Sequence, residues 1–371
     1  MSRILIIGDH TEFHTGGVAT HVATIAKELS EMGFCVTVLV LVKEGGGRTI
    51  EKGNLKIIGS NGFLRHVINI IREVKRHDIV HTHTLISTLF VKILFPKKKL
   101  LRTVHGYYSL ERIARGQLKE SSLNFKIIRH LEMLGVEVPN WIITVDRRIR
   151  KWLLSLRRIP DKLTTIPNTP DFKTLSGILK ASRRARKQLI TIGYAKALTS
   201  KNGPEYLILG FKEVISRLPQ FNMRLVIIGD GELRSYLEDL TRKLKIQRLV
   251  EFRGNLAHKE TLKVIAEEFD VLVVPSVNVA GVEEATSIVA QEAMYLGVPV
   301  IASNIGGLKE IIRHEKNGLL VKERDPVDLA EKLILLIESP KLRKRISYLG
   351  KKVALSNNMC KRTLEVYKKL I

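Results

Sequence analysis

Two glutamates, Glu284 and Glu292, stand eight residues apart in an otherwise largely apolar segment. On one helix they would lie about 12 Å apart along the axis. Paired carboxylates of glycosidases lie only roughly 5–9.5 Å apart. We therefore expect Glu284 and Glu292 to contact two parts of one extended ligand. A solvated helix face is the alternative, but their apolar neighbours argue against it because unsatisfied carboxylates are costly to bury.

Hydroxyl groups before one predicted helix and two lysines after one predicted strand each suit an anion. Thr286 and Ser287 precede a predicted helix that they can cap, so its free N–H groups would face a phosphate. Lys196 and Lys201 follow a predicted strand at Leu189–Gly193, where two ammonium groups could clamp a diphosphate. Lysines are abundant in this chain, so only the position after a strand distinguishes these two.

The first half of the chain has candidate residues at matching positions. Gly16 and Gly17 separate a predicted strand from a helix, where they form either an anion-binding turn or merely a tight one. His105 ends another predicted strand, and the following Gly106 would allow a ligand to approach closely. His81 and His83 end a third strand, and there we favour a structural role over a ligand contact.

Short apolar strands alternate with amphipathic helices along the whole chain, from Arg3–Gly8 to a last helix at about Met359 to Ile371. Continuously apolar strands are typical of parallel sheets covered on both faces. The pattern restarts near Leu189, which predicts two doubly wound α/β domains. We expect the linker at Pro167–Pro170 and the basic stretch Lys180–Lys187. Ligands should bind in a cleft at the carboxyl ends of the strands.

Composition and missing motifs exclude several classes of protein. The chain has 371 residues, 44% hydrophobic and 27% charged, which excludes a disordered or collagen-like chain. Its two cysteines, Cys35 and Cys360, allow no disulfide framework or zinc spacing. The turn after Arg224–Gly229 lacks the third glycine of a dinucleotide site, and no phosphate-binding P-loop is present. The absence of a targeting segment or membrane span predicts a cytoplasmic protein.

The formal net charge of +25 points to acidic partners. From Arg65 to Arg158 the chain has 20 Lys/Arg against 7 Asp/Glu. A basic face there would suit anionic lipid headgroups, although a generally basic surface is an equal alternative. A nucleic-acid-binding protein is disfavoured because aromatic residues are only 6% and no recognisable module is present.

The motif Glu-x7-Glu, followed by Gly-x-Pro-Val-Ile-Ala-Ser and Gly-Gly, resembles the retaining glycosyltransferases of family 4, which have the GT-B fold. The resemblance covers nearly the whole chain. It implies two Rossmann-like domains facing a central cleft. Residues 1–172 would form the acceptor-binding domain, with the helix at 359–371 packing back on it. Residues 173–358 would bind the nucleotide-sugar donor.

The resemblance also implies roles for single residues. Gly16 and Gly17 would lie beside the donor phosphate and the acceptor. The proposed catalytic pair would be Glu284, contacting the sugar hydroxyls, and His105, touching the donor sugar. The remaining donor-binding residues would hold the diphosphate, the ribose and the edge of the base; they are Lys196, Lys201, Thr286, Ser287, Ile288, Glu292, Arg253 and Gly254.

The implied reaction is transfer of a hexosyl group from a UDP- or GDP-sugar to a lipid-linked or saccharide acceptor, with retention and without a metal or other cofactor. The enzyme would be cytoplasmic, or peripheral on the inner face of the membrane, and would not bind nucleic acid. A nucleotide-sugar epimerase or a catalytically silent scaffold could be built on the same fold, because a fold does not fix a function. The chain departs from the family's pattern at two positions: Ala285 replaces a glycine of the family motif, and Asp146 stands where serine is usual.

Overall fold

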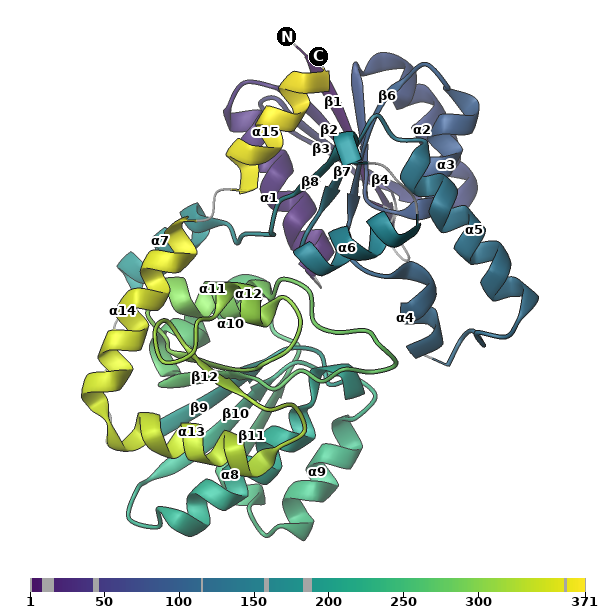
Figure 1. Ribbon diagram of the computed structural model, residues 1–371. Coiled ribbons are helices and arrows are strands. Elements are labelled where there is room, and N and C mark those ends of the chain that lie inside the picture. The colour runs from purple at the N-terminus through teal and green to yellow at the C-terminus, as the bar shows by residue number, and fades with distance from the viewer. Residues whose placement is uncertain are drawn as a thin grey trace. The chain divides into compact units, whose positions relative to one another are not determined.

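The computed structural model describes residues 2–8, 17–42, 47–114, 116–156, 160–182, 189–356 and 359–370. The chain folds into two compact units (Figure 1). The first unit comprises Met1–Asn168 together with Asn358–Ile371, and the second comprises Thr169–Asn357. No helix in the described ranges combines the length and the apolar character that crossing a bilayer requires.

The first unit is built on an eight-stranded sheet in the order β3-β4-β2-β1-β5-β6-β7-β8. The strands are β1 (Arg3–Gly8), β2 (Cys35–Val42), β3 (Thr49–Lys52), β4 (Leu55–Asn61), β5 (Ile79–Thr82), β6 (Lys99–Val104), β7 (Trp141–Thr144) and β8 (Leu163–Thr165). Neighbouring strands pair in parallel, except that β3 pairs antiparallel with β4.

Helices cover both faces of this sheet. One face packs against α1 (Gly17–Glu31) and α15 (Met359–Leu370), which lie side by side in Figure 1. The other face packs against α2 (Phe63–Arg76) and α3 (Leu85–Leu94). The remaining helices of the unit are α4 (Tyr108–Ala114), α5 (Leu123–Glu137) and α6 (Arg147–Leu156). The last helix of the chain thus completes the core of the first unit.

The second unit has a six-stranded parallel sheet in the order β11-β10-β9-β12-β13-β14. The strands are β9 (Ile190–Ala195), β10 (Met223–Ile228), β11 (Val250–Gly254), β12 (Val271–Val274), β13 (Val300–Ser303) and β14 (Leu319–Val321). One core contains α8 (Pro204–Arg217), α9 (Arg234–Lys243) and α13 (Pro326–Glu338). The other contains α7 (Phe172–Ala181), α10 (His258–Glu268), α11 (Ile288–Tyr295) and α12 (Leu308–Ile311), and α14 (Pro340–Ser356) contributes to both.

Each sheet has one point at which the chain connections leave in opposite directions. In the first unit this point lies between β1 and β5, and in the second it lies between β9 and β12. Open α/β sheets bind ligands outside the carboxyl ends of the strands at such a point. The predicted α/β class with two Rossmann-like domains is confirmed.

The first unit ends at Asn168, four residues before the boundary expected after residue 172. The linker expected at Lys180–Lys187 is wrong in its first part, and residues 183–188 lie outside the described part of the chain. Residues 172–181 form α7, whose Leu175 and Ile178 are buried in the second unit's core. Asp171 caps this helix by accepting hydrogen bonds from the Lys173 and Thr174 N–H groups. The segment folds as a helix because burying its apolar face stabilises it, although the basic residues at its end suggested a linker.

Candidate functional site

The carboxyl ends of β9 and β12 bring together Lys196, Ser276 and Glu284. The Lys196 Nζ lies 2.9 Å from Glu284 Oε2 and donates to Ser276 Oγ over 3.0 Å. The Ser276 hydroxyl in turn donates to Glu284 Oε2 over 3.4 Å. The side chains of Lys196 and Glu284 are only 12% and 13% exposed. Two residues that the sequence singled out for different reasons therefore share one site at the second unit's switch point.

The charges in this cluster depend on one another. Burial alone would raise the pKa of Glu284, but the positive charges of Lys196 and Lys201 outweigh it and hold the pKa below its usual value. Burial lowers the pKa of Lys196, although the charge of Glu284 opposes that shift. The carboxylate is thus held ionised beside two ammonium groups. An incoming anion could replace the carboxylate as the partner of Lys196.

The loops that carry these residues are fixed by backbone contacts. The carbonyl of Lys201 accepts the Val277 N–H over 2.9 Å, which ties the loop after β9 to the loop after β12. Gly229, at the end of β10, has a φ of 127°, and a Cβ there would lie 2.0 Å from the carbonyl oxygen of Lys196. Glycine at 229 therefore allows the backbone approach that places Lys196.

The start of α11 provides donor groups near Glu284. Ser287 occupies the position before the helix and is buried, but its side chain does not cap the helix as expected. In the described part of the chain its hydroxyl makes no hydrogen bond. The first N–H groups of a helix lack partners within the helix, so Ser287 and the N–H groups from Ile288 onward form a set of donors suited to an anion.

The loop from Glu284 to Ser287 is held by the Gly-Gly pair of the motif. The Gly307 N–H donates to the Glu284 carbonyl over 2.8 Å. A Cβ at Gly307 would lie 2.6 Å from the Ala285 carbonyl oxygen and 3.0 Å from the Thr286 nitrogen. Ala285 is absent from the described residues that have a positive φ, so its backbone does not require the glycine of the family motif. Glu284 itself precedes α11 rather than lying on it.

Glu292 lies within α11 and is buried. Its Oε1 is 2.7 Å from Nε2 of His258, the first residue of α10. The hydrogen bond with Glu292 raises the pKa of His258 above its usual value, with burial opposing the shift. A histidine that donates a hydrogen bond to Glu292 can fix the orientation of that carboxylate. The predicted ribose contact thus has a positioning partner that sequence reasoning missed.

Arg253 and Gly254 lie at the end of β11, two strands away from β9. The Arg253 guanidinium is paired with Glu251 and Glu268, each at 2.8 Å, and these pairs raise its pKa. The Gly254 carbonyl accepts the Gly229 N–H over 2.8 Å. The structure therefore places these two residues beside the turn after β10 but not in the Lys196–Glu284 cluster.

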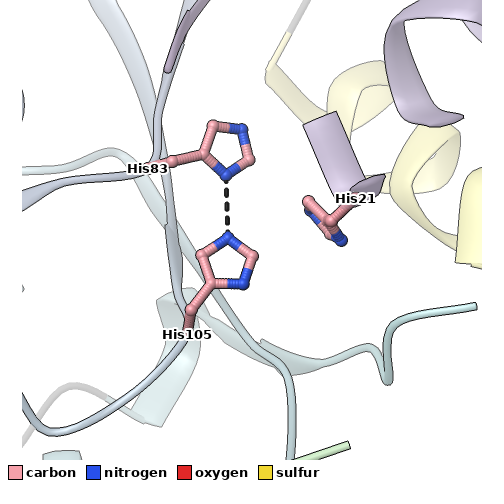
Figure 2. Close-up of side chains that lie close together, drawn as sticks. All are labelled: His21, His83 and His105. Atoms are coloured by element: carbon pink, nitrogen blue, oxygen red, sulfur yellow. Dashed lines mark hydrogen bonds between the residues drawn. The ribbon is translucent and has the colours of Figure 1, made fainter. Parts of the chain in front are cut away.

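Three histidines converge in the first unit (Figure 2). His83 follows β5, His105 follows β6 and His21 lies on α1. The His83 Nδ1 and the His105 Nε2 are 2.9 Å apart, and the His21 ring stands edge-on to both. Burial lowers the pKa of His21 to about 4, and a hydrogen bond with the Asn168 side chain opposes that shift. Of the predicted phosphate loop, Gly17 begins α1 and Gly16 lies outside the described residues.

Neighbouring residues have structural roles. His81 is fully buried, and its two ring nitrogens contact Tyr367 Oη at 2.6 Å and Thr103 Oγ1 at 2.7 Å. Asp146 accepts the Ile149 N–H over 2.7 Å at the start of α6, which accounts for this residue at a position where serine is usual. The space beside Gly106 is taken by the Glu111 carboxylate, 2.0 Å from where a Cβ would lie. Gly106 thus accommodates a protein carboxylate.

Two family descriptions match the chain, one for each unit. The description "Glycosyl transferases group 1" matches residues 178–353, and "Glycosyltransferase Family 4" matches residues 15–173. The chain is 32% identical to an uncharacterised glycosyltransferase of Methanocaldococcus jannaschii over 95% of this chain and 94% of that one. It is 23% identical to a D-inositol 3-phosphate glycosyltransferase of Corynebacterium urealyticum over 99% and 96%.

Solved structures share the fold over the full chain. Sucrose-phosphate synthase from Thermosynechococcus elongatus has a TM-score of 0.79 at 18% identity, covering 100% of this chain and 99% of that one. Anabaena HepE in complex with UDP-glucose has a TM-score of 0.74 at 17% identity, covering 100% and 99%. With both units matched and a relative above 30% identity along the whole chain, this protein belongs to the group 1 glycosyltransferases of family 4, and it is a GT-B transferase enzyme.

Proposed function

We propose that this enzyme transfers a hexosyl group from a UDP- or GDP-sugar to a lipid-linked or saccharide acceptor, with retention of anomeric configuration. The observation that carries the proposal is the cluster of Lys196, Ser276 and Glu284 at the second unit's switch point, beside the donor groups at the start of α11. The solved relative bound to UDP-glucose supports the donor class, and the inositol phosphate glycosyltransferases support a hydroxyl-bearing acceptor.

The cluster suggests how the leaving group is stabilised. When the bond between the sugar and the diphosphate breaks, negative charge grows on the phosphate oxygen. Lys196, Lys201 and the N–H groups at Thr286, Ser287 and Ile288 would meet that charge without requiring a metal ion. Such groups matter more in the transition state than in the ground state. We therefore propose metal-independent transfer.

The acceptor step follows from retention. The acceptor hydroxyl would attack the reacting carbon from the same face as the departing diphosphate. Its proton would pass to the departing phosphate oxygen, so no protein nucleophile is needed. Glu284, released from Lys196 by the diphosphate, would accept hydrogen bonds from the sugar hydroxyls. His105 would contact the donor sugar, and Glu292 would hold the ribose hydroxyls.

The first unit supports the lipid-linked class of acceptor and a site at the inner face of the membrane. On α3, Ile93 and Leu94 are 77% and 45% exposed. The C-terminal ends of α2 and α3 border one groove, lined by the segments 75–78 and 94–99. Exposed apolar side chains beside lysines and arginines match an anionic bilayer, which offers both acyl chains and negative charge.

Vesicle co-sedimentation tests this surface. Lys97 and Lys99 are exposed, and each lysine near an anionic surface contributes about 1 kcal/mol of binding. The double variant Lys97→Ala/Lys99→Ala should bind phosphatidylglycerol vesicles roughly 30-fold more weakly. Phosphatidylcholine vesicles should bind neither protein. The matched control is Val327→Ser/Tyr348→Ser, which removes exposed apolar residues of the second unit. Equal binding to both lipids would contradict the proposal.

Nuclear magnetic resonance of the products tests the transfer itself. Incubation with an α-linked nucleotide sugar and a lipid-linked or saccharide acceptor should release the nucleotide diphosphate and yield an α-glycoside. A β-glycoside would contradict retention. An epimer of the sugar formed from donor alone would identify an epimerase instead.

A further inference from the structure

We propose that His21, His83 and His105 form a site for a borderline-soft divalent metal ion, with Zn²⁺ the best fit. One nitrogen of each ring lies within 4.8 Å of the corresponding nitrogens of the other two. The rings approach from three separate elements, the helix α1 and the ends of β5 and β6 (Figure 2). This inference goes beyond the transfer reaction, for which no metal is proposed.

Two of the three ligand nitrogens already lie near the spacing that zinc requires. Zinc binds imidazole nitrogens at about 2.0–2.1 Å, so two ligands of a tetrahedral site lie roughly 3.3 Å apart. His83 Nδ1 and His105 Nε2 are 2.9 Å apart and share a hydrogen bond. That bond would be replaced by two bonds to the metal, and the ring that donates it would shift its proton to its other nitrogen. His21, whose ring centroid is 4.7 Å from that of His105, would move inward.

The ligand set selects the kind of ion. All three ligands are imidazoles and none is a carboxylate, so the site suits zinc, cobalt, nickel or copper rather than magnesium or calcium. Neutral imidazole is the form that binds metal. The net charge of +25 opposes the approach of any cation. The affinity for the metal would therefore have to come from its bonds to the three imidazole nitrogens.

The site would be open on one side. His21 and His83 are buried, but His105 is partly exposed. Three protein ligands leave the fourth position of a tetrahedral ion for water or another small ligand, whereas structural zinc sites are closed by four protein ligands. A bound ion would also occupy the His105 nitrogen. If His105 contacts the donor sugar, as proposed above, zinc would inhibit transfer.

Calorimetric titration of the chelator-treated full chain with Zn²⁺ tests the binding without using activity. We expect one equivalent to bind tightly. His83→Ala and His105→Ala should each weaken it by more than about 100-fold, since even the loss of an outer-shell partner costs roughly 10–100-fold. His130→Ala, which removes an exposed histidine of α5, is the matched control and should bind as the unaltered chain does.

Cobalt(II) makes the test independent of how the variants fold. Bound to three imidazoles and one further ligand, cobalt should give intense visible absorption bands in the unaltered chain, which excess Zn²⁺ removes. No stoichiometric Zn²⁺ binding, binding that both alanine variants retain, or a cobalt spectrum of six-coordinate type would each overturn the proposal. Inhibition by Zn²⁺ is a separate readout that rests on the proposed function. Metal binding without inhibition would count against the role of His105 in transfer but not against the metal site.

Discussion

The two units use the same edge of the same kind of sheet for different chemistry. At the switch point of the second unit, a lysine and a glutamate form a partly buried ion pair. At the corresponding edge of the first unit, the groups that converge are imidazoles, and burial keeps His21 uncharged. Both folds place side chains at the carboxyl ends of their strands, and the types of those residues determine the charge of each site. Ammonium groups suit a diphosphate, whereas neutral rings suit sugar hydroxyls or a soft metal ion.

Removing the carboxylate of the second unit should have the largest effect. Glu284→Gln keeps the shape but loses the charge that Lys196 and the sugar hydroxyls would meet. We expect kcat to fall by about 10²–10³-fold, as when one preorganised group is lost from an active site. Nucleotide affinity should change far less. Steady-state kinetics with product inhibition by the free nucleotide separates the two.

Two comparison variants sharpen the Glu284 result. Glu283→Gln alters the adjacent carboxylate, which receives a hydrogen bond from the Asn278 side chain, and should leave kcat almost unchanged. Glu292→Ala should mainly raise the donor KM. If Glu284→Gln weakens nucleotide binding as much as it lowers kcat, Glu284 does not act at the sugar.

Removing the ammonium group should rank second. Lys196→Ala would lose a charge-assisted contact of about 1.5–3 kcal/mol to the departing phosphate. We expect kcat/KM to fall roughly 10- to 150-fold. Lys201→Ala should fall in the same range, and Lys196→Arg should retain much of the activity. The exposed lysine in Lys243→Ala is the control, and full activity of both Lys196→Ala and Lys201→Ala would show that the diphosphate binds elsewhere.

Lys196→Ala should also destabilise the second unit. Glu284 would then remain buried without the ammonium group of Lys196, which costs about 3 kcal/mol in the free energy of unfolding. The double variant Lys196→Met/Glu284→Gln removes both charges and should recover part of the loss. A double variant less stable than Lys196→Ala would show that the pair does not account for the effect.

The His258–Glu292 pair predicts a modest dependence of stability on pH. The pKa of His258 is raised in the folded protein, so its contribution is fully present below the ordinary pKa of 6.5. It is lost as the pH rises from 6.5 through the folded pKa. The melting-temperature advantage of the unaltered chain over His258→Gln should therefore be constant below about pH 6.5 and shrink as the pH rises above it. A difference that stays constant with pH would contradict this assignment.

Chelation should have the smallest effect on transfer. Because lysines and N–H groups would stabilise the diphosphate, EDTA should leave the rate nearly unchanged. If the histidine site holds an inhibitory metal as the protein is isolated, EDTA should raise the rate instead. Loss of transfer with EDTA that magnesium or manganese restores would overturn metal-independent catalysis.

The strands and most of the helices follow from the alternation of apolar runs and amphipathic stretches. Three elements escaped that pattern. β3 is exposed along its whole length, so its sequence lacks the apolar signal of a buried strand. α4 spans only seven residues, and α7 was hidden by the basic residues that follow it.

The site was predictable at Lys196, where residue type and position after a strand coincide, and at Glu284, which begins the Glu-x7-Glu motif. It was not predictable where the partner comes from a distant element. Ser276, His258 and His21 contact their partners only because β12, α10 and α1 bring them there. The signal that existed for His258 and His21 was a histidine near the start of a helix. A histidine near the start of a helix does not identify its partner unless the order and register of the strands are known.

The most direct test of the account is a thermal-shift panel of UDP-, GDP-, ADP- and TDP-sugars on the unaltered chain and on Lys196→Ala. A ligand that binds only the folded state raises the melting temperature, by roughly 5–10 °C for a unit of this size at about 100 times its Kd. We predict such a rise for a UDP- or GDP-sugar, and a much smaller one in Lys196→Ala at the same ligand concentration. No shift with any of the four, or an equal shift in Lys196→Ala, would contradict the claim that the Lys196–Glu284 cluster of the second unit binds the donor.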